Sequence, residues 1–517
     1  MGDETGLTVF HKLKELSVNL TVYGVGDVAV QIASFLLLPL YVHVLSPSDY
    51  GAIALLLTVE QILRVVYRWG IDASFMRFYY DCADQPARQT LASTIFFFLI
   101  TVSGMVLVAG VSASPVLAPQ LFGRDGFTLP LQLVFINTFL GSLSFLPFHV
   151  LRIEGRARTY VTLTFSTNLA TLVAKFVLVV VVRMGVLGMF LGDLVVAVML
   201  AIVLLPRYGA LIRPVFSVPL LRRCLRFGLP RLPHSAAHQV IAGVDRYLLS
   251  LFVPLREVGI YGVGASLGLG LKLFLSAFET AGAPFYFNEM HEPDAKETFR
   301  TITTYGIGAL ALLAAGLSAV SFDLVRLMMT PQYYGAATIV PWIGLSVALQ
   351  GVYLLTSIGL NITRHTEYYP VSTGLAAVAS VGLNLLLIPQ FGVLGAAWSN
   401  VAAYGLLAVS GMAFSQRFYP VRYEWSRLGR LAGAAITATV AARLLLPASV
   451  APLWGVLGRG SCTVVVFVAV LTATGFFQPR ELRRIKEITN RLLRRAPATG
   501  APGPSTTSRR SESPHED

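Results

Sequence analysis

Apolar runs of about 20 residues recur along the whole chain, and they constrain its fold more than any other feature. A helix of that length crosses the roughly 30 Å hydrocarbon layer of a membrane. A membrane barrel would instead need short segments in which apolar and polar residues alternate, and runs such as LLAVSGMAF do not alternate. The sequence therefore predicts an all-α polytopic membrane protein.

The boundaries of the apolar runs, set by Pro, Gly and charged residues, give about 14 transmembrane helices. These spans are 17–45, 50–76, 88–112, 129–151, 159–182, 186–206, 229–253, 257–286, 299–321, 336–361, 368–389, 392–415, 429–447 and 455–477. An even number of spans returns the C-terminus to the side of the membrane on which the chain starts.

The basic residues predict the orientation of these spans. Lys and Arg collect in the cytoplasmic loops of membrane proteins. Most of the 40 Lys and Arg residues lie in segments on the same side as the N-terminus. We therefore expect both termini in the cytoplasm, and the net charge of +13 requires no nucleic-acid partner.

An internal repeat groups the helices. SPSDYGAIA at 46–54 aligns with PLREVGIYG at 254–262 at an offset of 208 residues, and GVLGMFLGD at 185–193 matches GVLGAAWSN at 392–400 at an offset of 207. Six predicted helices separate the copies, so both halves insert with the same orientation. The predicted architecture is two pseudo-symmetric six-helix lobes followed by two C-terminal helices.

The same features divide the chain into seven expected parts. These are a cytoplasmic amphipathic N-terminus (1–16), an N-lobe (17–206), a cytoplasmic basic linker (207–228), a C-lobe (229–415), two further helices (416–477), a basic amphipathic cytoplasmic helix (478–495) and a disordered tail (496–517).

Four charges recur every four residues in the second span. Glu60, Arg64, Arg68 and Asp72 would stack on one face of a single helix. A basic residue at mid-bilayer costs at least about 2.5–3.5 kcal/mol, so such residues face a wet cavity or a partner. Two interpretations stay open: these side chains contact an anionic substrate, or they neutralise one another at i, i+4 spacing.

The repeat gives the Arg64 position a counterpart in the C-lobe. An offset of 208 leads from Arg64 to Lys272 and from Gln31 to Gln239, so a cation and an amide recur at equivalent places. Lys272 has no carboxylate three or four residues away on its own helix, which makes it harder to neutralise. We predict that Arg64 and Lys272 hold an anionic substrate jointly.

Further polar side chains within the spans complete the candidates. Arg231 is a further candidate cation, whereas Lys175 is expected to snorkel or to pair between helices. Asp245 and Arg246, near the outer end of their helix, are interpreted as an interfacial ion pair or an outer gate. The candidates for the polar cavity wall and ion coupling are Asp27, Gln31, Glu60, Asp72, His234, His238, Gln239 and Glu279.

The motif HSAAH places His234 and His238 at the spacing of a zinc pair. It lacks the glutamate of HExxH and an evident third ligand, which favours a polar cavity wall over a metal site. The three cysteines are far apart and show no CxxC spacing. We therefore expect neither a metal nor a cofactor.

Four segments together carry a resemblance to a known family. LLPLYVHVLSPSDYGAIAL, RWGIDASFMRFYYD, GVDRYLLSLFVPLREVGIYGVGASL and NLLLIPQFGVLGAAWSN resemble the polysaccharide-flippase branch of the multidrug/oligosaccharidyl-lipid/polysaccharide exporter superfamily. The resemblance implies two six-helix lobes around a central cavity lined largely by the first two helices of each lobe. It also implies transport of undecaprenyl-pyrophosphate-linked oligosaccharides from the inner to the outer leaflet of a bacterial inner membrane. Membrane lipids and polysaccharide polymerase machinery are the implied partners.

Two other functional classes make different demands on the sequence than a flippase does. A drug/cation antiporter of the same fold should have a net acidic cavity, whereas the first two helices of the two lobes carry Arg64, Arg68, Arg231 and Lys272. A membrane-embedded glycosyl- or acyltransferase should show clustered carboxylates or a catalytic His in a sizeable outer loop, and the predicted outer loops are short. The sequence favours a flippase for an anionic lipid-linked glycan, and not an enzyme.

Overall fold

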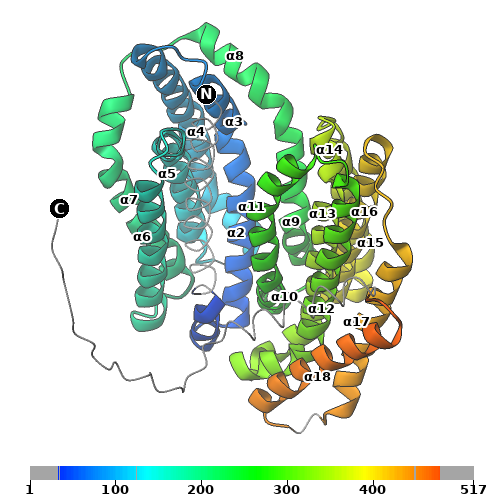
Figure 1. Cartoon of the computed structure of the whole chain (residues 1–517). Helices are drawn as coiled ribbons and strands as arrows, with labels where there is room; N and C mark the ends of the chain where they lie inside the picture. Colours follow the sequence, from blue (N-terminus) through cyan, green and yellow to red (C-terminus); the bar gives the residue numbers. More distant parts are fainter. Residues whose placement is uncertain (1–32, 34, 124, 448–449, 478–517) are drawn as a thin grey trace, which may run out of the picture.

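The computed structural model describes residues 33, 35–123, 125–447 and 450–477, and every regular element within them is helical (Figure 1). The expected segments 1–16, 478–495 and 496–517 lie outside the described residues. The same holds for most of the first span, including Asp27 and Gln31.

Helices α2 to α7 pack together on one side of the molecule (Figure 1). Their bounds are α2 Pro47–Arg68, α3 Ile71–Tyr79, α4 Gln85–Phe122, α5 Thr128–Ile153, α6 Ala157–Phe176 and α7 Gly185–Leu211. Helix α8 (Val218–Gly228) runs along one end of the molecule and leads to the second group.

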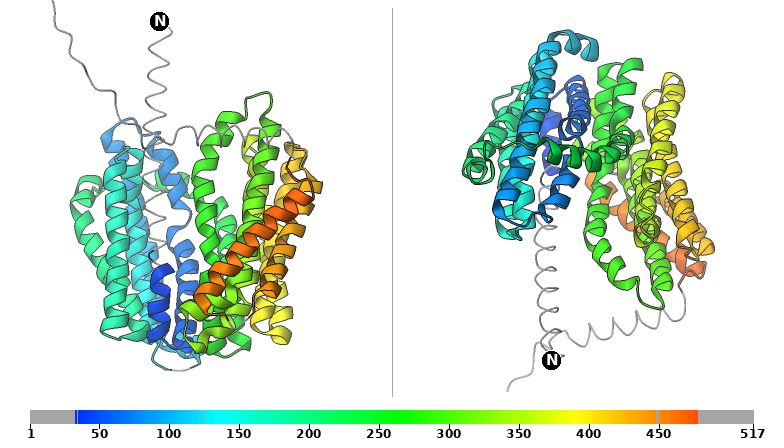
Figure 2. Two further views of the ribbon diagram at one scale, coloured as in Figure 1. Left: turned by 60° about the horizontal axis from the view of Figure 1, so that its bottom comes forward. Right: turned by 90° about the horizontal axis from the view of Figure 1, so that it is seen from above.

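Helices α9 to α16 form the second group, and the two groups stand side by side in both views of Figure 2. Their bounds are α9 Leu232–Phe252, α10 Leu255–Gly268, α11 Lys272–Glu289, α12 Ala295–Met328, α13 Val340–Thr356, α14 Ile358–Ile362, α15 Tyr368–Phe391 and α16 Val393–Phe418. Two last helices, α17 (Trp425–Leu445) and α18 (Pro452–Ala473), pack against α12.

Eleven of the described helical segments are long and apolar enough to cross a membrane. The all-helical, multi-pass membrane fold is thus confirmed, whereas the count of 14 spans stays a prediction. Helices α9, α10 and α11, and a short apolar helix at Phe35–Val44, occupy the other predicted spans.

The two groups of helices meet where α2 crosses α10, and this contact obeys the repeat. A Cβ atom at Gly51 would overlap the carbonyl oxygen of Leu255, and a Cβ atom at Gly259 would overlap the carbonyl oxygen of Pro47. Residues 255 and 259 follow residues 47 and 51 by 208 positions, so the repeat exchanges the two contacts. The backbones approach this closely because both positions are glycine.

Two predicted spans are broken, which corrects the sequence-based boundaries. The span 50–76 is interrupted because Trp69 and Gly70 adopt positive φ angles of 50° and 69° between α2 and α3. A Cβ atom at Gly70 would also overlap the carbonyl oxygen of Gly228, so only glycine fits there. The span 257–286 is divided into α10 and α11 by a 3₁₀ turn at Leu269–Leu271.

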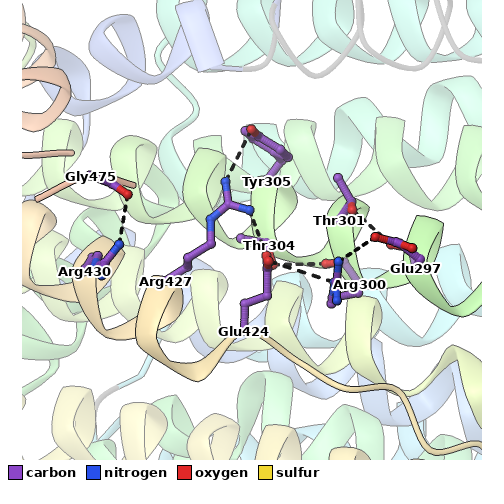
Figure 3. Close-up of polar contacts among 9 residues, drawn as sticks. All are labelled: Glu297, Arg300, Thr301, Thr304, Tyr305, Glu424, Arg427, Arg430 and Gly475. Atoms are coloured by element: carbon purple, nitrogen blue, oxygen red, sulfur yellow. Dashed lines mark hydrogen bonds and ion pairs between the residues drawn. The ribbon is translucent and has the colours of Figure 1, made fainter. Parts of the chain in front are cut away.

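Polar contacts join α17 and α18 to each other and to α12 (Figure 3). Arg427 Nη1 donates to Glu424 Oε2 over 2.9 Å, and Thr304 of α12 donates to the same carboxylate over 3.1 Å. Arg430 Nη1 donates to the carbonyl of Gly475, just beyond α18, over 3.0 Å. Near the other end of α12, the buried Asp323 pairs with Arg459 of α18. Both ends of the attachment therefore rest on ionic or charge-assisted bonds.

Replacing Arg459 by alanine should destabilise the protein by about 3–5 kcal/mol, because Asp323 would keep a buried charge without its partner. The measurement is the thermal midpoint of the detergent-solubilised protein. The Arg256→Ala variant is the control, because the Arg256–Glu257 pair is exposed. The double variant Asp323→Leu, Arg459→Leu should recover much of the loss, and an Arg459→Ala protein as stable as wild type would contradict the assignment.

Candidate functional site

The four predicted charges on the second span form two ion pairs. Arg64 Nη2 lies 2.5 Å from Glu60 Oε1, and Arg68 Nη1 lies 3.2 Å from Asp72 Oδ2. The prediction that all four lie on one continuous helix is wrong, because Asp72 belongs to α3, beyond the break at Gly70. We call these four residues the charge stripe; it contains the pairs that mutual neutralisation requires.

Much of the Arg64 side chain is nevertheless exposed. Its exposed fraction is 61%, against 19% for Glu60. An ion pair that is this open leaves guanidinium donors available, because one carboxylate engages only part of the five-donor fork. Pairing with Glu60 and contact with an anionic cargo are therefore compatible at this residue.

A third ion pair lies near the charge stripe in the same lobe. Lys175 Nζ of α6 is 2.7 Å from Asp193 Oδ1 of α7, so of the two expected arrangements, snorkelling and pairing between helices, the structure shows the pairing. Asp193 also lies within electrostatic range of Glu60 and Arg64. The N-lobe thus gathers two cations and two carboxylates, Arg64, Lys175, Glu60 and Asp193, beside the second half of α2.

Lys272 stands in a different group of charges, in the other lobe. It is the first residue of α11 and lies within electrostatic range of Arg246, Asp245 and Glu279. Lys272 forms no ion pair with any residue that the structure describes. It is also not in contact with Arg64. The joint clamp of Arg64 and Lys272 therefore stays a prediction.

The carboxylate of Asp245 is buried, with 3% exposure, and two neutral donors hold it. Tyr261 Oη of α10 donates over 2.5 Å, and Asn400 Nδ2 of α16 donates over 2.8 Å. The guanidinium of Arg246 donates instead to the carbonyl of Ala242 over 3.2 Å. The interpretation of Asp245 and Arg246 as an interfacial ion pair is therefore wrong, whereas an outer-gate role stays a prediction.

Sequence reasoning missed Tyr261 and Asn400 as partners of Asp245. One signal for Asn400 was present, because the repeat GVLGMFLGD/GVLGAAWSN ends on Asp193 in one copy and on Asn400 in the other. Both copies use this position for a polar contact with another helix, Lys175 in one lobe and Asp245 in the other.

The remaining predicted residues that the structure describes lie just before α9, on α9 and on α11. Arg231 precedes α9 and lies over the ring of Phe227, 5.6 Å from its centroid. His234 Nδ1 contacts Thr373 Oγ1 of α15 at 2.9 Å. Gln239 is half-buried on α9, and Glu279 is exposed on α11. Within the described part of the chain, no three His, Cys, Asp or Glu residues form a group that could hold a metal ion.

Known proteins share both sequence and fold with this chain. The model of a family described as "Polysaccharide biosynthesis protein" matches residues 42–338. An uncharacterized membrane protein of Methanocaldococcus jannaschii is 22% identical over 408 residues, which cover 72% of this chain and 78% of that protein.

Solved transporter structures have the same fold. The lipid II flippase MurJ, in an inward closed conformation, has a TM-score of 0.67 at 13% identity, with 88% of this chain and 98% of that chain covered. An inward-facing multidrug resistance MATE family transporter has a TM-score of 0.60 at 14% identity, with 78% and 95% covered.

Proposed function

The chain belongs to the polysaccharide biosynthesis protein family, and from this premise we propose that it is a flippase for an anionic lipid-linked glycan. The cargo is a polyprenyl-(pyro)phosphate-linked oligosaccharide, which alternating access carries from the inner to the outer leaflet of a bacterial cytoplasmic membrane. Both termini lie in the cytoplasm, and polysaccharide polymerase machinery takes up the product. The family and the fold support a transporter, while the substrate is our own inference.

One observation carries the choice of an anionic cargo. Cations lie within or beside the first helices of both lobes, and Arg64 keeps 61% of its side chain exposed despite its ion pair. A phosphate leaving water loses hydration that fixed cations can replace, and a forked guanidinium suits phosphate oxygens. Arg64, Arg68, Arg231 and Lys272 are the groups that we assign to this task.

The main alternative is a drug/cation antiporter, and the likeness to the MATE fold supports this alternative. A cationic drug would meet the same four basic residues, and their repulsion would have to be offset by the carboxylates of Glu60, Asp72 and Glu279. The matching family is described by polysaccharide biosynthesis, which favours the glycan. A glycosyl- or acyltransferase is the third and least supported class.

Deleting the gene tests the proposal. The expected result is accumulation of a lipid-linked oligosaccharide, detected by mass spectrometry of extracted lipids, together with loss of the corresponding surface polysaccharide. Expression of the wild-type chain should reverse both effects. Unchanged lipid-linked glycans combined with increased drug sensitivity would instead establish the antiporter.

A further inference from the structure

A cavity of about 290 Å³ lies within the second lobe, between α9, α13, α14 and α15. Its polar lining includes His234, His238, Tyr353, Asn361 and Tyr369, and no Asp, Glu, Lys or Arg contributes to it. The volume is close to the lower end of small-ligand sites, roughly 300 Å³, which fits a single ring better than an oligosaccharide. The cavity is thus uncharged and small, with a few polar groups set in a largely apolar lining.

A hydrogen-bond chain fixes one wall of this cavity. The hydroxyl of Thr373 donates to the carbonyl of Tyr369 over 2.9 Å, so the hydrogen between Thr373 and His234 comes from the Nδ1 atom of the ring. In the neutral imidazole this leaves Nε2 as an acceptor. Tyr369 Oη in turn donates to the carbonyl of Ser357 over 3.1 Å. His234 and Tyr369 are therefore held in place before any ligand arrives.

Aromatic surface forms the second element of the cavity. The rings of Tyr353 and Tyr369 meet edge to face, with centroids 6.3 Å apart. The ring of Tyr353 is held from behind by α16, where a Cβ atom at Gly411 would press against it. A rigid aromatic face of this kind can receive the C–H face of a flat polar ring at little cost in side-chain entropy.

Two polar side chains in the lining have hydrogen-bonding capacity to spare. Among the described residues, neither the ring of His238 nor the amide of Asn361 has a hydrogen-bond partner. Such groups are satisfied by water or by a ligand. An amide offers two donors and an acceptor, which is the pattern that neighbouring hydroxyls on one ring can match.

Cations border this neutral cavity without lining it. His238 lies within electrostatic range of Lys272, and His234 lies within range of Arg231. Helix α14, which contributes Asn361, lies at the same end of the molecule as α8, the end that the topology predicts to be cytoplasmic (Figure 1). A cargo loaded from that side would meet the cations and the cavity together.

We propose that this cavity is a subsite for one neutral sugar residue of the glycan, while the phosphate lies beside Lys272. This inference rests on the proposed function and adds a division of labour: charge recognition outside the cavity, and hydroxyl and ring recognition within it. It predicts that the chain distinguishes a glycosylated lipid from the same lipid without sugar.

Equilibrium binding to the full chain in nanodiscs tests the subsite. The two probes are undecaprenyl pyrophosphate and the lipid-linked oligosaccharide purified from the deletion strain. Asn361→Ala should weaken binding of the glycosylated lipid about tenfold, which corresponds to about 1.4 kcal/mol, and should leave the sugar-free lipid within about twofold. Tyr353→Leu should act in the same direction, whereas Tyr353→Phe, which keeps the ring, should bind as wild type does.

The outcomes separate this inference from the flippase proposal. Equal loss of both probes in Asn361→Ala, or a wild-type protein that binds both lipids equally, would overturn the sugar subsite and leave the flippase standing. If the deletion strain accumulates no lipid-linked glycan, the flippase proposal fails and the subsite fails with it. Thermal midpoints of all variants establish that a selective loss is not a folding defect.

Discussion

Lys272→Glu is expected to abolish export of the lipid-linked glycan, whereas Lys272→Arg should retain most of it. Lys272 forms no ion pair among the described residues, so its charge remains available to the cargo. Glutamate would place a negative charge beside the anionic headgroup, in a setting where water screens little. The measurement is complementation of the deletion strain at matched membrane abundance, read as the amount of lipid-linked intermediate that remains.

The charge stripe supplies the matched comparison for Lys272. Arg64→Glu should also stop export if Arg64 contacts phosphate, and exchanging Glu60 for Arg at the same time should then fail to restore it. If the 2.5 Å pair with Glu60 is the whole role of Arg64, the exchanged pair should restore export. An active Lys272→Glu protein would contradict the proposal that the two cations hold the cargo together.

The helical fold and the repeat could be predicted because each depends on the order of residues within short segments of the chain. A sufficiently long apolar run predicts a membrane-spanning helix whatever the helix packs against. The repeat aligns Gly51 with Gly259 from the sequence alone, without showing that they are in contact. The structure adds that the two glycines lie at the same helix crossing. Gly51 packs against the carbonyl of Leu255, and Gly259 packs against the carbonyl of Pro47. The 208-residue offset in the sequence therefore corresponds to a symmetric pair of contacts between α2 and α10.

The helix break and the environment of Asp245 could not be predicted, because each depends on distant chain segments. The periodic pattern predicted one helix over 50–76. The helix instead breaks at Gly70, which packs closely against the backbone of Gly228. Asp245 was assigned from its neighbour Arg246, whereas its hydrogen-bond donors, Tyr261 and Asn400, lie 16 and 155 residues away. The residue pattern of one helix indicates which side chains on that helix are neighbours, but it contains no information about side chains contributed by other helices.

Gly259→Val is expected to prevent export although the protein still inserts. A side chain at this position would overlap the carbonyl of Pro47, so α2 and α10 would have to separate at their crossing. This crossing lies at the end of the lobes that the topology predicts to be outer, where Tyr50 Oη and Ser266 Oγ are 3.3 Å apart. The variant should therefore be held open toward the outside, and a cargo loaded from the cytoplasm would lack a sealed cavity.

Labelling of a cysteine at Ser266 with a membrane-impermeant maleimide, in a chain without Cys82, Cys224 and Cys462, measures this opening. Labelling should increase in the Gly259→Val background and stay low with Gly433→Val, because a Cβ atom at Gly433 meets nothing within 4 Å. Since the repeat exchanges the contacts of the two glycines, Gly51→Val should reproduce the effect. Export that survives both substitutions with unchanged labelling would show that the crossing tolerates a side chain, and the glycine seal would have to be abandoned.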